Sequence, residues 1–148
     1  MKKVHIFLLV VFSLITFFAN RAALPTDIME SRNIVTAREI VSDRCWLVPT
    51  MNGELRLEKP PLPTWVAAGI EEVCPDNLAA QRTAAGVMGC VWTLYLFLLV
   101  RYISRRDDLA AATVLVFLTC YNVVLMGRSA TWDIYCHAVM MGAIYYLT

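Results

Sequence analysis

The chain has 148 residues, of which 59% are hydrophobic, and its formal net charge is +1. Ordinary soluble domains are less apolar, with about half of their residues in that class. The sequence has no basic run and no interleaved basic and aromatic pattern, so we expect no nucleic-acid partner.

The apolar residues are concentrated in four blocks of about the length that a helix needs to cross a bilayer. We expect transmembrane helices at about residues 4–23, 82–101, 109–127 and 133–148. The stretch between the first two, about residues 24–81, is expected to be a loop outside the bilayer. The predicted fold class is an all-α membrane protein, a transmembrane helix bundle with a long outer loop.

The two ends of the chain carry separate predictions. The first block has no clean small-x-small cleavage site after it, which favours an uncleaved anchor over a signal peptide. The fourth block is still apolar where the sequence stops at Thr148. We therefore interpret residues 1–148 as the N-terminal part of a longer polytopic membrane protein, with a complete short protein as the alternative.

Positive charges predict the orientation, because basic loops stay in the cytoplasm. Lys2 and Lys3 precede the first block, and Arg101, Arg105 and Arg106 separate the second from the third. Both sites are therefore expected in the cytoplasm of a bacterium, with the protein in its inner membrane. The long outer loop and the short link before the fourth block would then lie in the periplasm.

The outer loop contains two of the five cysteines, Cys45 and Cys74. An oxidising compartment would permit a disulfide between them, although the sequence leaves the pairing open. The other three cysteines lie in apolar blocks, where we expect them to pack.

The first part of the outer loop has helical spacing. Ile34, Ala37 and Val41 recur at steps of three and four residues among polar ones, which predicts an amphipathic helix at the membrane surface. Asp27 and Glu30 precede this pattern at the spacing of a capping box. A capping role and a functional role both stay open for these two carboxylates.

The middle of the outer loop combines a turn signal with a proline pair. Asn52-Gly53 is typical of a tight β-hairpin turn. Lys59 precedes Pro60 and Pro61, which restrict it to an extended backbone. The lysine is then suited to meet a lipid phosphate as a point charge. In the alternative interpretation the prolines end the hairpin before the next helix, and the lysine snorkels to the interface.

Further ionisable residues lie at the outer ends of the apolar blocks. Arg82 begins the second block, Arg128 ends the third, and Asp133 begins the fourth. An ionisable residue that points into a membrane bundle is a functional candidate, although Arg128 and Asp133 could instead pair with each other. His137 is interpreted as a hydrogen-bonded core residue rather than as a metal ligand, and the sequence contains none of the common metal or nucleophile motifs.

Taken together, these motifs resemble the first outer loop of membrane glycosyltransferases of the GT-C fold. The groups that resemble it most are the protein O-mannosyltransferases and the lipid A aminoarabinose transferases. The shared pattern includes Glu30-Ser-Arg32, Ala37-Arg38-Glu39, Trp46-Leu-Val-Pro49, Asn52-Gly53, Glu58-Lys59-Pro60-Pro61-Leu62, Trp65, Arg82 and Arg128-x-x-x-x-Asp133. The resemblance covers the whole chain but only the N-terminal part of a typical member.

The chain departs from the family pattern at one position. The family usually has an Asp-Glu pair in which the Asp is the preferred catalytic carboxylate. Aligned through Ala37-Arg38-Glu39, that Asp falls on Met29 and the Glu on Glu30. Asp27, two residues earlier, is another source of a carboxylate, so the identity of the base stays open.

The resemblance implies transfer of a sugar from a polyprenyl phosphate to a lipid, glycan or protein acceptor on the outer side, with inversion. This reaction needs a carboxylate as general base and cations that stabilise the departing phosphate. The expected catalytic residues are Glu30, Asp27 and Asp133, and the expected lipid-phosphate ligands are Lys59, Arg82 and Arg128.

Other partners and functions are also considered. Membrane lipids are expected around the helices, no cofactor is certain, and a divalent cation stays open. The alternative function is a non-enzymatic transporter or assembly protein whose outer loop binds a partner. Transport is disfavoured because charges cluster at helix ends and the apolar blocks have few internal Gly or Pro residues.

Overall fold

The computed structural model describes residues 3–21 and 23–148, and these residues form seven helices and one β-hairpin. The helices are α1 (Lys3–Phe18), α2 (Ile28–Asp43), α3 (Pro61–Val73), α4 (Leu78–Ser104), α5 (Asp107–Thr119), α6 (Tyr121–Arg128) and α7 (Asp133–Leu147). The hairpin consists of β1 (Thr50–Met51) and β2 (Glu54–Leu55). The predominantly helical class is as the sequence predicts.

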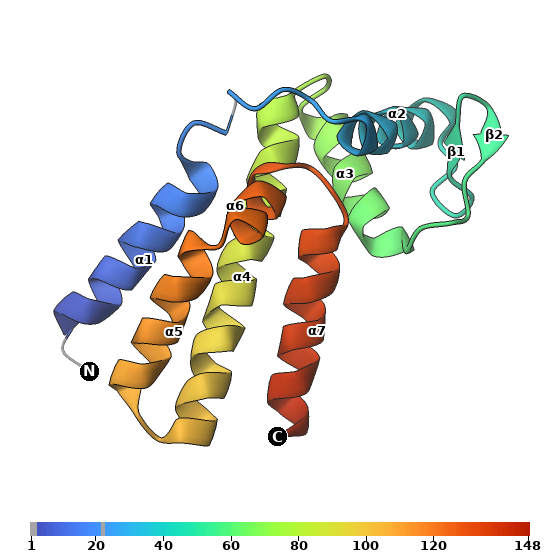
Figure 1. Ribbon diagram of the computed structural model, residues 1–148. Helices are drawn as coiled ribbons and strands as arrows, with labels where there is room; N and C mark the ends of the chain where they lie inside the picture. The colour runs from blue at the N-terminus through green and yellow to red at the C-terminus, as the bar shows by residue number, and fades with distance from the viewer. Residues whose placement is uncertain (1–2, 22) are drawn as a thin grey trace.

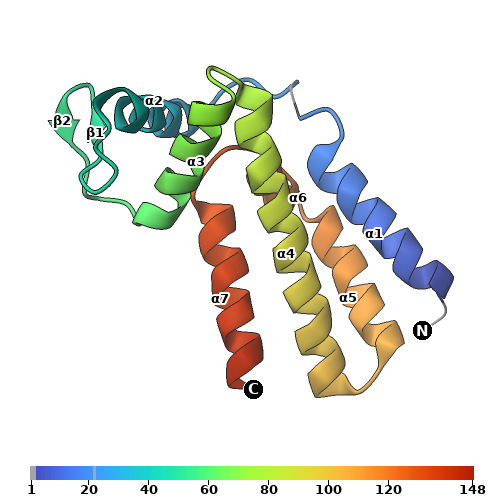
Figure 2. The same ribbon diagram turned by 180° about the vertical axis from the view of Figure 1, so that it is seen from behind.

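Helices α1, α4, α5 and α7 run side by side, and α2, α3 and the hairpin gather at one end of them (Figures 1 and 2). The central helix is α4, which packs against α1, α5, α6 and α7. The link between α4 and α5 lies at the opposite end from α2 and α3 (Figure 1). We call α2, α3 and the hairpin the outer layer.

Helix α4 is the one helix of the described residues that is long and apolar enough to cross a membrane. Helices α5 and α6 meet this condition together but are bent by 69° at their junction, and α1 is a shorter apolar helix. The continuous helix expected at residues 109–127 is therefore broken. The break lies at Cys120, whose backbone is extended with φ −66° and ψ 123°.

Two other expected helix boundaries shift for local reasons. The first helix ends at Phe18, before the expected end at residue 23, and the chain then turns at Asn20 with φ 55°. Asparagine is one of the few residues that adopt this left-handed conformation readily. Helix α4 begins at Leu78 rather than at residue 82, because the Asn77 side chain caps it by accepting the Ala80 amide at 3.0 Å.

A helix forms where the amphipathic pattern predicts one, as α2, while its place at a membrane surface stays a prediction. Asp27 is its N-cap and accepts the Ile28 amide at 2.7 Å, so the capping role predicted for Asp27 is confirmed. Helix α2 packs on α3 through Ala37, Ile40 and Ala68. Its buried face is not wholly apolar, because it also carries Glu30, Asn33 and Thr36.

Helix α3 is an addition to the expected outer loop. Pro60 occupies its N-cap and Pro61 its first position, where the missing amide hydrogen costs no helical hydrogen bond. The alternative interpretation, in which the proline pair separates the hairpin from a following helix, is thus confirmed. It does not exclude a functional position for Lys59, which lies directly before the pair.

The Asn-Gly hairpin is also confirmed. Asn52 and Gly53 both have positive φ, 56° and 78°, as a two-residue hairpin turn of this kind requires. The carboxylate of Glu39 on α2 accepts hydrogen bonds from the Thr50 hydroxyl and from the amides of Asn52 and Gly53. Helix α2 therefore positions the hairpin as well as packing on α3.

The contact of α1 with α4 and α6 depends on two glycines. The Phe17 ring is fully buried and lies against Gly89 of α4 and Gly127 of α6. A Cβ on Gly89 would lie 2.8 Å from the ring, and one on Gly127 would overlap it further. Hydrogen in place of a side chain at both positions lets the three helices meet around Phe17.

We predict that Gly127→Ala lowers the free energy of unfolding by about 1–3 kcal/mol, because the added methyl group overpacks the Phe17 site. The control is Gly69→Ala on α3, where a Cβ would meet no atom within 4 Å. That variant should be neutral or more stable by up to about 1 kcal/mol, since alanine favours a helix interior. Thermal unfolding followed by circular dichroism measures both, and equal stability of the two variants would contradict the packing argument.

Candidate functional site

The most deeply buried ionic contact joins Glu30 of α2 to Arg82 of α4. Their side chains are 1% and 0% exposed. The Arg82 Nε donates to Glu30 Oε1 and the Arg82 Nη2 donates to Glu30 Oε2, each at 2.8 Å. Two parallel charge-assisted hydrogen bonds of this kind fix the relative orientation of both groups.

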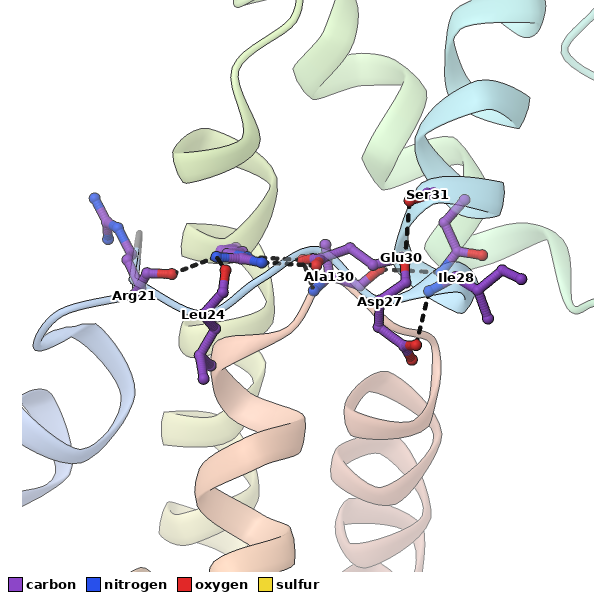
Figure 3. A network of polar contacts seen from close by, with 9 residues as sticks. Arg21, Leu24, Asp27, Ile28, Glu30, Ser31 and Ala130 are labelled. Carbon is purple, nitrogen blue, oxygen red and sulfur yellow. Dashed lines mark hydrogen bonds and ion pairs between the residues drawn. The ribbon is translucent and has the colours of Figure 1, made fainter.

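The same ion pair holds two further segments of the chain. The Arg82 Nη1 donates to the carbonyl oxygens of Arg21 at 2.6 Å and of Leu24 at 3.0 Å. Glu30 Oε1 also accepts the amide of Ala130 at 2.8 Å (Figure 3). The pair therefore joins the segment after α1, helix α2, helix α4 and the link between α6 and α7.

The surroundings of Glu30 favour its ionised form. Burial acts to raise the pKa of Glu30, but the hydrogen bonds from Arg82 and Ala130 and the charge of Arg82 outweigh this effect and lower the pKa below its ordinary value. The Asp27 amide contributes in the same direction, as the second contact of a capping box would. A carboxylate whose pKa is lowered and whose oxygens are already bonded is poorly suited to accept a proton from a substrate.

Arg128 makes contacts with the end of α1. Its Nε donates to the Thr16 carbonyl at 2.6 Å, and its Nη2 donates to the Ile15 carbonyl at 3.4 Å. The C-terminal end of a helix carries a partial negative charge, so a cation at its last carbonyls is favourable. The interpretation of Arg128 and Asp133 as an ion pair is wrong, because Arg128 is bonded to α1 and no such pair forms among the described residues.

Lys59 contacts Trp132, which lies in the link between α6 and α7 and directly precedes Asp133 in the chain. The Lys59 Nζ lies 5.3 Å from the centroid of the Trp132 ring, within the range of a cation–π contact. Trp132 is only 6% exposed, Lys59 is partly exposed, and Asp133 is exposed at the start of α7. A cation from the segment after the hairpin thus lies against the residue that directly precedes Asp133.

A second cation at this place, Arg56, was not identified from the sequence. Its side chain is 3% exposed, and its guanidinium carbon lies 4.6 Å from the Trp132 centroid. Its Nη1 donates to the Arg32 carbonyl and to the Thr36 hydroxyl, each at 2.6 Å. The alternation of Leu55, Arg56, Leu57 and Glu58 after the hairpin turn is typical of a short strand and gives no sign that this arginine is buried.

The position of the Trp132 link depends on α2. Glu30 binds the Ala130 amide, and the Asn33 side-chain amide donates to the Ala130 carbonyl at 3.0 Å. Both polar groups of one peptide unit are thus held by two residues on one face of α2. Asp27 lies one turn earlier and is exposed. Its carboxylate accepts a hydrogen bond from the Ile28 amide, and within the described structure it makes no direct contact with this link.

The described residues contain no group of three or more His, Cys, Asp or Glu side chains that could hold a metal ion. His137 is hydrogen-bonded, as the sequence favoured, but only partly buried: its Nδ1 lies 2.6 Å from the Asp133 carbonyl, and its ring stacks on Trp92 with a centroid distance of 4.8 Å. Cys45 and Cys74 are both free and exposed.

Comparison with known proteins finds the same family as the sequence motifs. Residues 58–148 match the family model described as dolichyl-phosphate-mannose-protein mannosyltransferase. The chain is also 33% identical over 104 residues to the undecaprenyl phosphate-alpha-4-amino-4-deoxy-L-arabinose arabinosyl transferase of Shewanella sediminis (strain HAW-EB3). That match covers 70% of the chain and 19% of the relative, so the chain spans about a fifth of the relative's length. No solved structure matches.

We predict that Glu30→Gln lowers the free energy of unfolding by about 3–5 kcal/mol, because it leaves the Arg82 charge buried without its counter-ion. The control is Glu72→Gln on α3, an exposed carboxylate whose loss should change stability by less than about 0.5 kcal/mol. Chemical unfolding measures both variants. A Glu30→Gln protein as stable as the control would show that the pair does not hold the four segments together.

The lowered pKa of Glu30 also predicts a dependence of stability on pH. A carboxyl group with a lower pKa in the folded state binds fewer protons there than in the unfolded chain, so its contribution is present above its ordinary pKa of 4.5. This contribution is lost as the pH falls through the folded-state value. The stability difference between the wild type and Glu30→Gln should therefore shrink below pH 4.5. A difference that stays constant down to the acid limit would contradict the assigned direction.

Proposed function

Because the chain belongs to the dolichyl-phosphate-mannose-protein mannosyltransferase family, we propose that the protein is a membrane glycosyltransferase that uses a polyprenyl-phosphate-linked sugar. The acceptor is a lipid, glycan or protein on the outer side, and the anomeric carbon is inverted by a single displacement. The related transferase is named for an undecaprenyl phosphate sugar, which supports a bacterial polyprenyl donor.

The surface composition of the helices supports a membrane location. Several large apolar side chains of α1 are more than half exposed, among them Val4 at 63% and Phe7 at 65%. Exposed apolar surface on this scale suits a lipid environment better than water. The basic residues Arg101, Arg105 and Arg106 lie around the α4–α5 link, at the end away from the outer layer (Figure 1). The positive-inside rule then favours a periplasmic outer layer in a bacterial inner membrane.

The observation that carries the proposed mechanism is the contact of Lys59 with Trp132, next to Asp133. Lys59 is assigned to the phosphate of the lipid donor, and Asp133 is assigned as the general base. Asp27 is the second candidate for the base. It is exposed, and its protonation would break no buried ion pair.

The proposed reaction uses one displacement. The acceptor hydroxyl attacks the anomeric carbon of the donor, and its proton passes to the carboxylate of Asp133. The bond between the anomeric carbon and the phosphate oxygen breaks, and its electron pair stays on that oxygen. The ammonium group of Lys59 stabilises the negative charge that develops on the departing phosphate.

Glu30, Arg82 and Arg128 have a different proposed role. The first two bind each other, and Arg128 binds the last carbonyls of α1. We assign them to positioning: Arg82 and Glu30 hold the α6–α7 link, and Arg128 fixes α1 against α6. They stabilise the place where the donor binds without themselves contacting its phosphate.

We predict that Lys59→Met and Asp133→Asn each reduce sugar transfer by about a hundredfold or more in the full-length protein, the range expected for loss of a charge that acts in the transition state. Mass spectrometry of membranes would follow consumption of the lipid-linked sugar and thereby identify it. The matched controls are Arg44→Gln and Asp43→Asn, which are exposed in the outer layer and should retain activity. Full activity of Lys59→Met would remove the lysine from the mechanism, and an inactive Asp27→Asn beside an active Asp133→Asn would assign the base to Asp27.

A further inference from the structure

Within the described part of the chain, three positively charged side chains lie near Trp132 without a carboxylate in an ion pair with any of them. Arg56 and Lys59 both lie over the Trp132 ring, and Arg32 is close enough to Arg56 for its charge to affect the Arg56 pKa. We call Arg32, Arg56 and Lys59 the Trp132 cation cluster. Among the described residues, no carboxylate forms an ion pair with any of the three.

Two nitrogen atoms of the cluster are buried without a partner. The Nε–H groups of Arg56 and Arg32 donate no hydrogen bond within the described part of the chain. Burial and the positive charge of Arg32 both act to lower the pKa of Arg56, and the carboxylate of Glu58 opposes them with a smaller effect. A buried guanidinium with a cationic neighbour and no counter-ion is unfavourable unless another group supplies negative charge.

In the Glu30–Arg82 pair, by contrast, a carboxylate neutralises the charge of the buried arginine. Arg82 is fully buried, and its bidentate carboxylate lies at 2.8 Å. Arg56 is 3% exposed and donates instead to the Arg32 carbonyl, the Thr36 hydroxyl and the Asn33 side-chain oxygen, none of which carries a charge. Lys59 and Arg32 are both partly exposed, so an anion can reach the cluster from their side.

We propose, on the basis of the transferase function above, that the Trp132 cation cluster selects a phosphate monoester over a phosphate diester. Lys59 contacts the phosphoryl group, while the buried charge of Arg56 and the partly buried charge of Arg32 act on it from a greater distance. The recognised chemistry is the phosphoryl dianion, whether it is carried by a prenyl lipid or is free.

The reaction gives this preference a purpose. In the donor the phosphate is a diester with one negative charge. When the bond to the sugar breaks, the electron pair stays on the phosphate oxygen and the product is a monoester, with a charge of about −1.5 to −2 near neutral pH. Groups that bind the charge developed during bond breaking more strongly than the charge of the donor lower the barrier. Every positive charge near the phosphate favours the dianion over the monoanion, so the two arginines enlarge the preference that Lys59 alone would give.

The experiment measures binding of soluble prenyl lipids to the full-length protein in a neutral detergent by titration calorimetry. The probes are farnesyl phosphate, its methyl diester, farnesol and inorganic phosphate. We expect the wild type to bind the monoester about tenfold or more tighter than the diester, which corresponds to about 1.4 kcal/mol. Inorganic phosphate should displace farnesyl phosphate, because the phosphoryl group itself is recognised.

The variants assign the preference to individual charges. The Arg32 side chain makes no hydrogen bond or ion pair within the described residues. The Arg32→Gln variant should therefore fold as the wild type does. Arg56→Met removes the buried charge, and Arg56→Lys retains it while changing the hydrogen bonds. We expect the monoester preference to fall to about twofold or less in Arg32→Gln and Arg56→Met, and to persist in Arg56→Lys and in the exposed control Arg44→Gln.

Several outcomes would overturn the proposal. It fails if the wild type does not prefer the monoester, if farnesol binds as tightly as farnesyl phosphate, or if inorganic phosphate cannot compete. It also fails if Arg32→Gln and Arg56→Met keep the full preference. A wild type that transfers sugar without any monoester preference would reject this inference and leave the proposed function intact, whereas a protein that binds neither phosphate lipid would reject both.

Discussion

The structure depends on one buried ion pair, Glu30 with Arg82. Neither charge is stable away from water alone, and each is retained because the other supplies two hydrogen bonds at 2.8 Å. The remaining donors and acceptors of the pair are used on the backbone, at Arg21, Leu24 and Ala130. A single electrostatic contact therefore determines how the outer layer lies on the helices beneath it, because it binds segments that the chain separates widely.

The candidate site follows from this constraint. Helix α2 holds both polar groups of the Ala130 peptide through Glu30 and Asn33, and the tryptophan two residues later is thereby placed under the segment that follows the hairpin. The hairpin is in turn held by Glu39 of the same helix. Helix α2 thus positions both halves of the Lys59 and Trp132 contact. Its buried polar face serves this purpose, which a helix that merely rested on a membrane would not need.

The sequence predicts those features that local chemistry decides. The Asn52-Gly53 turn, the Asp27 cap and the start of α7 at Asp133 all follow from residues within a few positions of the feature, and the family was recognised from spacings of short motifs. Features decided by distant contacts were missed. Neither Pro nor Gly marks the break at Cys120, the partner of Arg128 is a helix end 112 residues away, and the burial of Arg56 requires α2 and Trp132 to close over it. Glu30 illustrates both cases. The local sequence predicts its position near the start of a helix but does not predict its ion pair with Arg82.

The central claim is that one prenyl phosphate binds beside Lys59, where the segment after the hairpin contacts Trp132 just before the start of α7. Electron cryomicroscopy of the full-length protein with a bound polyprenyl phosphate tests this claim most directly. The account predicts phosphate density in contact with the Lys59 ammonium group, with the Glu30–Arg82 pair intact below it. Density for the phosphate at the opposite end, among Arg101, Arg105 and Arg106, or on an Arg82 released from Glu30, would contradict the account.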